Sequence, residues 1–572
     1  MASDNRVEAD RAALASAQAR GPVATLKTYV SLSGPGWLQS AMTLGGGSLG
    51  SSLYLGILGG ASLLWLQPLA MLFGVVMLGA ISYVTLSTGE RPFRAINQHI
   101  NPVLGWSWLI ATLLANMVWA LPQYSLCFAV CEQNFFPGLF GPGKVLDTSP
   151  GGSDAGKWLV SGLIFTVCTL VTWSYGSGSW GARLYDRVLK AAVAVIVLSF
   201  FAVVVRMAFA GDGINLSAIA AGLVPNPRQF FEPVESLRPL LDAISDPAAR
   251  QYWSDLIVSQ QRDVMLSAGA AAVGINMTFL LPYSLLNRGW GKEFRGLAIF
   301  DLSTGTFIPF VLATGCIIIA SSAQFHTQLP DGFRLAEQGV EVPERFQKPY
   351  EKLVAGREAA AASGEYAIES PIDKAEQRIA GALVRRDTFD LASSLERLFQ
   401  AGEGSSGRFL ANAVFGGGVV AMTLSSISLM MLISGFAICE VLDRPASGWI
   451  FRLGCLPPAI GIAWPLLWDG DARAWLTVIA GVYGAMLLPI AYVTFAVMMN
   501  QRKLLGDAAP TGATRVTWNL LMAIAATAAT AAGISAVWKK AGVSGLIFVA
   551  AYIALVIAVQ LWRRPANSTA ES

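Results

Sequence analysis

"AMTLGGGSLGSS", residues 41–52, places three consecutive glycines, Gly45, Gly46 and Gly47, inside an apolar stretch long enough to cross a membrane. Glycine is the weakest ordinary helix former, so a triplet favours local unwinding of the backbone. Backbone that leaves the helix at membrane depth is tolerated only where protein, water or a bound molecule satisfies its polar groups. The stretch therefore predicts a membrane-spanning helix that is broken near its centre, beside a polar space.

The composition of the 572-residue chain is that of a polytopic membrane protein. Hydrophobic residues make up 54% of it, charged residues only 13%, and the mean hydropathy is +0.52. A soluble domain carries about a quarter charged residues. We therefore expect the lipid bilayer as its surroundings, and the net charge of +3 is too small to indicate nucleic acid as a partner.

The apolar stretches predict an all-α fold with about twelve transmembrane helices, because each span needs about 20 apolar residues. We place them at 36–58, 61–86, 105–131, 158–176, 187–210, 264–286, 296–322, 408–437, 448–468, 473–499, 514–537 and 541–562. With the N-terminus inside, the short inner loops and the C-terminal tail hold fifteen Lys and Arg residues, against five in the short outer loops. This imbalance predicts two cytoplasmic termini. With no signal or transit peptide evident, a plasma (inner) membrane is the expected location.

The spans divide the chain into five segments. We expect a cytoplasmic tail (1–30), a first repeat of helices 1–5 (31–210), an extracytoplasmic loop (211–263), a second repeat of helices 6–10 with an extracytoplasmic insertion at 323–407 (264–500), and helices 11–12 with a C-terminal tail (501–572). The insertion is rich in charge and contains sequence typical of a soluble helix. A solvated elaboration of the loop is the favoured interpretation, and a separate binding domain is the alternative.

The sixth span is interrupted as well, by "GINMTFLLPYS" from Gly274 onward. Unwound segments at corresponding positions five helices apart indicate a transporter built from inverted repeats, with its site near the bilayer midplane. For the glycine triplet alone, close packing of helices through small residues is the competing interpretation.

"GPGWLQSAMTLGGGSLGSSLYLG" (34–56) resembles the first span of the Nramp family, proton-coupled divalent-metal transporters of the amino acid–polyamine–organocation (APC) superfamily. The resemblance continues in "IATLLANM" (110–117), "GARLYDRVLKAAVAVIVLSF" (181–200), "ISGFAI" (433–438) and "LLPIAYVTFAVMMNQRKLLG" (487–506). It implies a LeuT-type bundle of two inverted five-helix repeats. In such a bundle, helices 1 and 6 are broken around a central site and helix 8 packs against helix 1.

The residues that hold metal in the Nramp family are replaced here. Its helix-1 aspartate and asparagine match Gly45 and Ser48, and its helix-6 methionine matches Asn276, with Met277 one position away. Two helix-6 histidines match Thr278 and Tyr283, and the acidic pair of helix 3 matches Leu113 and Asn116.

Every titratable or anionic group of the family motif has become neutral, and this decides the expected chemistry. Manganese and iron(II) favour carboxylate or imidazole ligands, and a buried dication needs compensating negative charge. The resemblance makes a divalent cation the default substrate, but the residues support only a hydrated or weakly bound cation, and we assign no metal ligand. The alternative occupant is a small neutral, zwitterionic or anionic solute such as an amino acid, held by the glycine-rich amides beside the positive end of a half-helix.

Three further residues are candidates for the pathway or for ion coupling. Asp301 is an acid well inside a span, where ionisable residues are functional candidates, although an ion pair near Arg295 is the alternative. Ser425 and Ser426, in "MTLSSISLMM" of helix 8, either line the pathway or join helices through hydrogen bonds.

These patterns predict a secondary-active transporter that works by alternating access. A membrane sensor that does not transport is the alternative from another class. No nucleotide-binding loop and no catalytic constellation is visible in the spans, so we expect neither enzymatic activity nor a cofactor.

Overall fold

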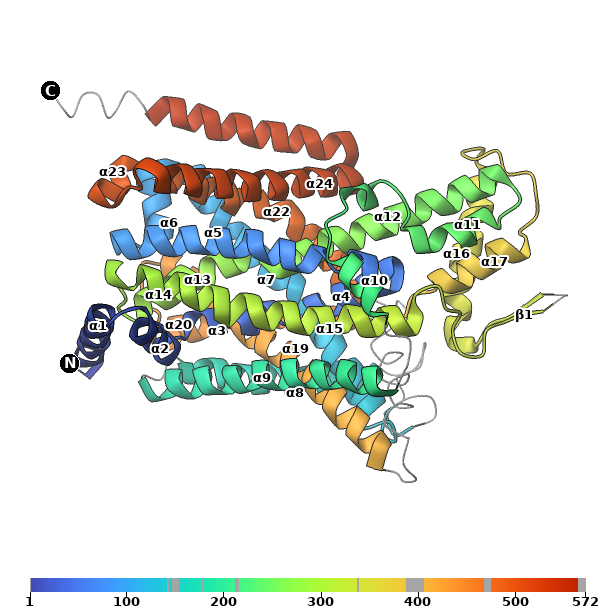
Figure 1. The fold of residues 1–572 in the computed structure, drawn as a ribbon, viewed down its shortest axis with the longest axis horizontal. Helices are drawn as coiled ribbons and strands as arrows, with labels where there is room; N and C mark the ends of the chain where they lie inside the picture. Colours follow the sequence, from blue (N-terminus) through green and yellow to red (C-terminus); the bar gives the residue numbers. More distant parts are fainter. Residues whose placement is uncertain are drawn as a thin grey trace.

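The structure, a computed structural model, describes residues 2–140, 144–146, 154–175, 179–210, 215–336, 339–386, 406–467 and 475–563. Within these ranges the protein is a bundle of α-helices with one two-stranded antiparallel sheet, β1 (Arg334–Ala336) and β2 (Gly339–Glu341). The helices of the bundle run roughly parallel to its long axis (Figure 1). This agrees with the predicted all-α membrane architecture.

The helices of the first half of the chain follow the predicted spans closely. They are α1 (Ala2–Arg20), α2 (Pro22–Leu32), α3 (Pro35–Thr43), α4 (Gly46–Gly59), α5 (Leu66–Thr88), α6 (Pro92–Ala95), α7 (Pro102–Val130), α8 (Ala155–Tyr175), α9 (Ser179–Ala210), α10 (Leu216–Gly222) and α11 (Arg238–Asp242).

The second half contains α12 (Pro247–Ala272), α13 (Ile275–Asn287), α14 (Arg295–Leu302), α15 (Ile308–Phe325), α16 (Glu344–Ala362), α17 (Lys374–Leu383), α19 (Ser406–Val441), α20 (Gly448–Gly454), α21 (Trp464–Leu467), α22 (Trp475–Met499), α23 (Arg502–Leu505) and α24 (Gly512–Arg563).

Ten helices of the described residues are long and apolar enough to cross a membrane. The first predicted span is not among the ten because it is divided into α3 and α4, each shorter than a bilayer-spanning helix. The last two predicted spans form one element, α24, with a kink at Gly542, where φ is 55°. The total of twelve spans and the inverted repeats remain predictions.

One helix departs from the prediction at its outer end. Residues 247–263 were expected to belong to a loop, but α12 already begins at Pro247, well before the predicted start at residue 264. Asp246 caps this end by accepting hydrogen bonds from the amides of Ala248 and Ala249, and a proline at the first helical position suits the fixed φ that it imposes. The correction is physical: this stretch is polar because it lies beyond the membrane, not because it lacks helix.

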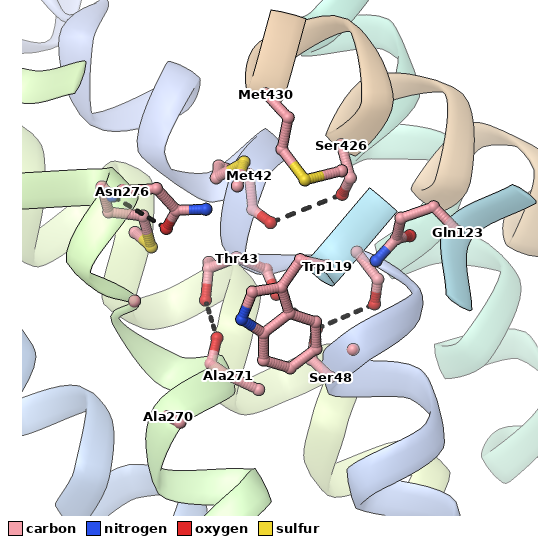
Figure 2. A pocket seen from close by; sticks show the side chains of 14 residues that line it. Met42, Thr43, Ser48, Trp119, Gln123, Ala270, Ala271, Asn276, Ser426 and Met430 are labelled. Atoms are coloured by element: carbon pink, nitrogen blue, oxygen red, sulfur yellow. Dashed lines mark hydrogen bonds between the residues drawn. The ribbon is translucent and has the colours of Figure 1, made fainter. Parts of the chain in front are cut away.

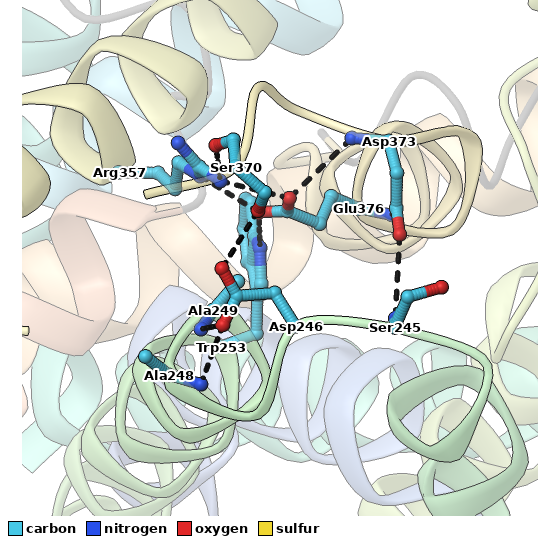
Figure 3. Close-up of polar contacts among 9 residues, drawn as sticks. All are labelled: Ser245, Asp246, Ala248, Ala249, Trp253, Arg357, Ser370, Asp373 and Glu376. Atoms are coloured by element: carbon cyan, nitrogen blue, oxygen red, sulfur yellow. Dashed lines mark hydrogen bonds and ion pairs between the residues drawn. The ribbon is translucent and has the colours of Figure 1, made fainter. Parts of the chain in front are cut away.

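The insertion packs on this extended part of α12 (Figure 3). Arg357 of α16 forms two hydrogen bonds with the Glu376 carboxylate of α17, at 2.8 and 3.0 Å, and Trp253 of α12 donates its indole N–H to the same carboxylate at 2.9 Å. All three side chains are almost fully buried. Asp373 and Glu376 also form a reciprocal cap at the start of α17. We call Trp253, Arg357 and Glu376 the insertion clamp.

A second contact joins the insertion to α4. The hydroxyl of Tyr54 donates a hydrogen bond of 2.7 Å to the carbonyl of Arg386, just after α17, and Tyr54 itself is buried. In Figure 1, α1 and the end of α24 lie at one end of the bundle, whereas α16 and α17 project beyond the opposite end. The insertion therefore holds the outer halves of both interrupted spans.

Candidate functional site

The bundle contains a cavity where its two interrupted spans meet. About 350 Å³ of unfilled space lies between the ends of α3 and α12, the starts of α4 and α13, and the middles of α7 and α19 (Figure 2). Its lining residues are Met42, Thr43, Gly45, Gly47, Ser48, Trp119, Gln123, Ala270, Ala271, Gly274, Asn276, Met277, Ser426 and Met430. This volume is at the small end of the range for ligand pockets.

The two predicted interruptions are present, but they are shorter than the sequence indicates. The first lies at Leu44 and Gly45, where ψ is 56° and −179°, and the second at Val273 and Gly274, where ψ is 100° and 161°. Gly46 already belongs to α4, so the triplet is not unwound as a whole. Likewise the stretch from Ile275 onward is regular helix despite its proline.

Close approach, rather than backbone freedom, explains two of the glycines, since neither has a positive φ. A Cβ atom at Gly45 would stand 2.1 Å from the hydroxyl of Ser426, and one at Gly47 would stand 2.2 Å from the ring of Trp119. Only glycine allows α7 and α19 to lie this close to the break. The competing interpretation of the triplet, tight packing through small residues, therefore holds together with the break.

Serine hydroxyls take over the carbonyl groups that lose their helical partners at the end of α3. Ser425 donates to the carbonyl of Ala41 at 3.1 Å and Ser426 to that of Met42 at 3.5 Å. Ser48 donates to the carbonyl of Thr43. Because an unpaired buried carbonyl costs about 1–3 kcal/mol, these hydroxyls make the break tolerable inside the bundle.

Thr43 connects the first break to the second. Its hydroxyl lies 2.6 Å from the carbonyl of Ala272 and 3.1 Å from that of Ala271, at the end of α12. The two half-helices α3 and α12 thus end side by side at the cavity, each with the negative end of its dipole.

Side-chain amides serve the starts of the other two half-helices. Gln123 of α7 accepts a hydrogen bond of 2.8 Å from the amide of Gly46, and Asn276 accepts one of 2.9 Å from the amide of Met277. The amide nitrogen of Asn276 donates to Asn116 at 3.2 Å, and Asn116 in turn donates to Ser434 at 3.1 Å. A chain of neutral groups therefore runs from α13 through α7 to α19.

Carboxylate, imidazole and thiol groups do not occur among the residues that line the cavity. Within the described residues, no group of three or more His, Cys, Asp or Glu side chains is arranged to hold a metal ion. Hydroxyl, amide and carbonyl oxygens and three methionine sulfurs are what the cavity presents. Such a site stabilises dipoles and single charges far better than an uncompensated dication.

The structure brings most of the predicted site residues together. Six of them line the cavity, namely Gly45, Gly47, Ser48, Asn276, Met277 and Ser426. Gly46, Asn116 and Ser425 lie directly behind this lining and bond to it or to the ends of its helices.

Two predicted residues lie away from the cavity lining. Thr278 accepts a hydrogen bond of 2.9 Å from the indole of Trp108 and donates to the carbonyl of Ile275. Tyr283 stacks on Phe279, with ring centroids 4.5 Å apart, on the side of α13 that faces Glu440. Their roles in a pathway remain predictions.

Asp301 occupies the start of α3 rather than the cavity. Its carboxylate accepts hydrogen bonds from the amides of Gly34 and Gly36, at 3.1 and 2.6 Å, and from the hydroxyl of Ser33. It therefore caps α3 from a neighbouring helix. Its electrostatic partner is Arg288, whereas Arg295, the partner expected from the sequence, contacts Ser87 and the ring of Tyr83.

Sequence reasoning missed the contribution of α7 to the cavity. Trp119 and Gln123 both line it, and they follow Asn116 at helical spacings of three and seven residues. That spacing, with two amide side chains inside an apolar span, is the signal that could have identified them. Met42 and Met430 also line the cavity, but nothing distinguishes their positions in the sequence from ordinary packing.

Comparison with known proteins identifies the fold. No protein-family model matches the chain, and no curated protein sequence is similar to it. Its structure is similar to that of a manganese transporter of Eremococcus coleocola bound to an aromatic bis-isothiourea compound, with a TM-score of 0.56, 14% identity and 94% of each chain covered. A single-residue mutant of that transporter matches with the same TM-score and coverage at 13% identity. At such identities the likeness concerns the fold alone.

Proposed function

We propose that this chain, whose fold is shared with a bacterial manganese transporter, is a secondary-active membrane transporter. One observation carries the proposal: two spans are interrupted at the same depth, and their four helix ends surround one cavity lined by polar groups. In this reading the cavity holds the solute, and the half-helices tilt to expose it to one side of the membrane at a time.

The favoured solute is small, polar and either neutral or zwitterionic. The first-turn amides of Gly47 and Ser48 have no intrahelical partners by helix geometry, so they can accept a carboxylate at the positive end of α4. The ends of α3 and α12 offer carbonyl dipoles for a cationic group. The cavity volume suits a molecule of a few heavy atoms rather than a drug-sized one.

Flux measurements test the carrier function itself. The full-length protein in proteoliposomes is exposed to gradients of a panel of labelled small amino acids and of Mn²⁺. We expect accumulation of an amino acid, and at least a tenfold loss of flux in Asn276→Leu, because Asn276 lines the cavity. Saturable binding without flux of any member of the panel would instead support the sensor interpretation.

A divalent metal is the second candidate substrate. Three thioether side chains, Met42, Met277 and Met430, line the cavity, and the structural neighbours are manganese transporters. Calorimetry with Mn²⁺ separates the two substrates. We expect a dissociation constant weaker than about 1 mM, equivalent to less than about 4 kcal/mol.

Asn276→Asp adds one negative charge to the cavity lining without changing the shape of the side chain. If only charge prevents tight metal binding, this variant binds Mn²⁺ at least tenfold more tightly than the native protein. Micromolar binding of Mn²⁺ by the native protein would contradict the proposed neutral or zwitterionic solute.

A further inference from the structure

We propose that a sodium ion binds between the end of α3 and α19, beside the cavity, and that its gradient drives solute movement. The site consists of five oxygen atoms: the carbonyls of Ala41, Met42 and Met422 and the hydroxyls of Ser425 and Ser426. The binding site stands on these contacts alone, whereas the coupling to solute rests on the function proposed above.

The five oxygens are gathered by the break in the first span. The hydroxyl of Ser425 lies 3.1 Å from the carbonyl of Ala41 and 3.0 Å from that of Met422 in its own helix. The hydroxyl of Ser426 lies 3.5 Å from the carbonyl of Met42 (Figure 2). Ser425 and Ser426 are both almost fully buried.

These spacings leave the serine hydroxyls weakly bound. Hydroxyl–oxygen hydrogen bonds are commonly about 2.7–2.8 Å long, so contacts of 3.0, 3.1 and 3.5 Å are long. Each hydroxyl has one hydrogen but two lone pairs, so its lone pairs stay available to a cation. Oxygens about 3.0–3.5 Å apart are also the edges of an octahedron with a radius of about 2.1–2.5 Å, which covers the oxygen distances of hard cations.

The charge of this oxygen set selects a monovalent ion. All five oxygens are neutral, and the negative end of the α3 dipole, equivalent to about half an elementary charge, is the main compensating field. A dication would stay largely uncompensated, whereas one positive charge is matched by the dipole and five oxygens. The short radius favours sodium over the larger potassium ion.

The site is placed to couple with the cavity. Ser426 and Met42 belong both to the oxygen set and to the cavity lining, and the hydroxyl of Ser426 stands where a Cβ of Gly45 would be. Bound sodium would fix the end of α3 against α19 and thereby fix the shape of the cavity beside it. Without sodium, only two long hydroxyl contacts hold that end to α19.

Thermal unfolding of the purified full-length protein tests for the ion. NaCl is titrated against choline chloride at constant ionic strength, with KCl and MnCl₂ as comparison salts. We expect a saturable rise in Tm with Na⁺ that neither K⁺ nor Mn²⁺ reproduces, because binding to the folded state alone stabilises it. In Ser425→Ala and Ser426→Ala, the half-maximal Na⁺ concentration should rise at least tenfold.

Two further variants keep the test interpretable. Thr423→Val is the matched control: Thr423 lies on α19, is buried, and bonds only to carbonyls of its own helix at 3.1 Å in the contacts described, so its Na⁺ response should stay within twofold. Ser426→Cys keeps the side-chain size but replaces oxygen by sulfur, a poor partner for a hard cation. It should unfold like the native protein in choline and lose the Na⁺ response.

The outcomes separate the ion site from the transporter. If Na⁺ leaves the Tm of the native protein unchanged, or if all serine variants respond like Thr423→Val, the hydroxyls only cap α3 and the sodium site is wrong, whatever the flux assay shows. If Na⁺ binding is lost in the serine variants but no solute moves, the site stands and the proposed transport fails. Solute flux that depends on a Na⁺ gradient and is abolished in Ser426→Cys supports both.

Discussion

The cavity and the insertion clamp both contain buried polar groups, but they satisfy them in opposite ways. At the cavity, hydroxyls and amides of Ser425, Ser426 and Gln123 cap broken helices through single, neutral hydrogen bonds. In the clamp, the ionised pair of Arg357 and Glu376 forms a bidentate contact that Trp253 completes. Neutral bonds can be exchanged for a ligand at little cost, whereas a buried ion pair resists separation. The difference teaches where the molecule is built to change and where it is built to stay fixed.

The largest expected effect belongs to the clamp. Glu376→Ala leaves the Arg357 guanidinium buried without its counter-charge, and breaking one partner of such a pair costs about 3–5 kcal/mol. Limited proteolysis of the insertion, together with thermal unfolding, measures the loss. The control is Glu232→Ala, which removes an ion pair with Arg238 whose side chains are about half exposed; it should cost at most about 1 kcal/mol. Equal effects of the two variants would remove the contrast between fixed and exchangeable regions.

Gly47→Ala tests the cavity side of the comparison. The new methyl group would meet the ring of Trp119, and overpacking of this kind costs about 1–3 kcal/mol. Because the contact narrows the cavity, flux should fall at least tenfold while the protein still folds. Gly269→Ala is the matched control, since a Cβ at this position of α12 meets open space; it should leave flux unchanged. Normal flux in Gly47→Ala would mean that the cavity is not on the solute path.

Asp301→Asn asks whether a buried charge outside the clamp also acts as a fixed support. The carboxylate caps α3 through three donors, so loss of its charge should cost roughly 1–2 kcal/mol of stability, since hydrogen bonds to charged groups are the stronger ones. Thermal unfolding measures this cost. Flux per folded molecule should be retained. Unchanged stability with uncoupled flux would instead assign Asp301 the coupling role considered from the sequence.

His326 provides the smallest effect, at the boundary between the two regions. Its ring contacts the carbonyl of Ile57 at 2.9 Å and the hydroxyl of Ser236 at 2.6 Å, and burial lowers its pKa below the ordinary value of 6.5. The neutral form is therefore favoured in the folded protein, so the contribution of His326 to stability is complete above pH 6.5 and is lost as the pH falls below it. Thermal unfolding at pH 7.5 and 5.0 should show a smaller acid-induced loss in His326→Gln. An identical loss in the variant would exclude His326 as the group responsible.

The position of both helix breaks could be predicted from the sequence because it depends on local composition. Gly45 and Gly274 mark the breaks within one residue or at the first residue of the predicted segments. The groups that satisfy the broken ends come from far along the chain: Ser425 bonds to a carbonyl 384 residues away, and Gln123 to an amide 77 residues away. A sequence pattern does not encode such pairing, so the capping role of these residues required the fold.

The extension of α12 escaped prediction for a different reason. Span prediction follows hydropathy, and the first turns of α12 are polar because they pack against the insertion instead of lipid. Its start is nevertheless signalled locally, by Asp246 followed by Pro247, a capping residue before a proline. Asp301 shows the same limit in reverse: its depth in the span suggested ion coupling, whereas its partners at the start of α3 depend on tertiary contacts.

The insertion grips α4 through Tyr54 and α12 through Trp253, so one appendage is fastened to half of each interrupted span. Neither half can tilt alone without pulling apart a buried contact, and the outer doorway must swing as a single leaf with the appendage as its handle. An antibody fragment raised against α16 would then work as a doorstop, halting movement at a cavity that it never touches.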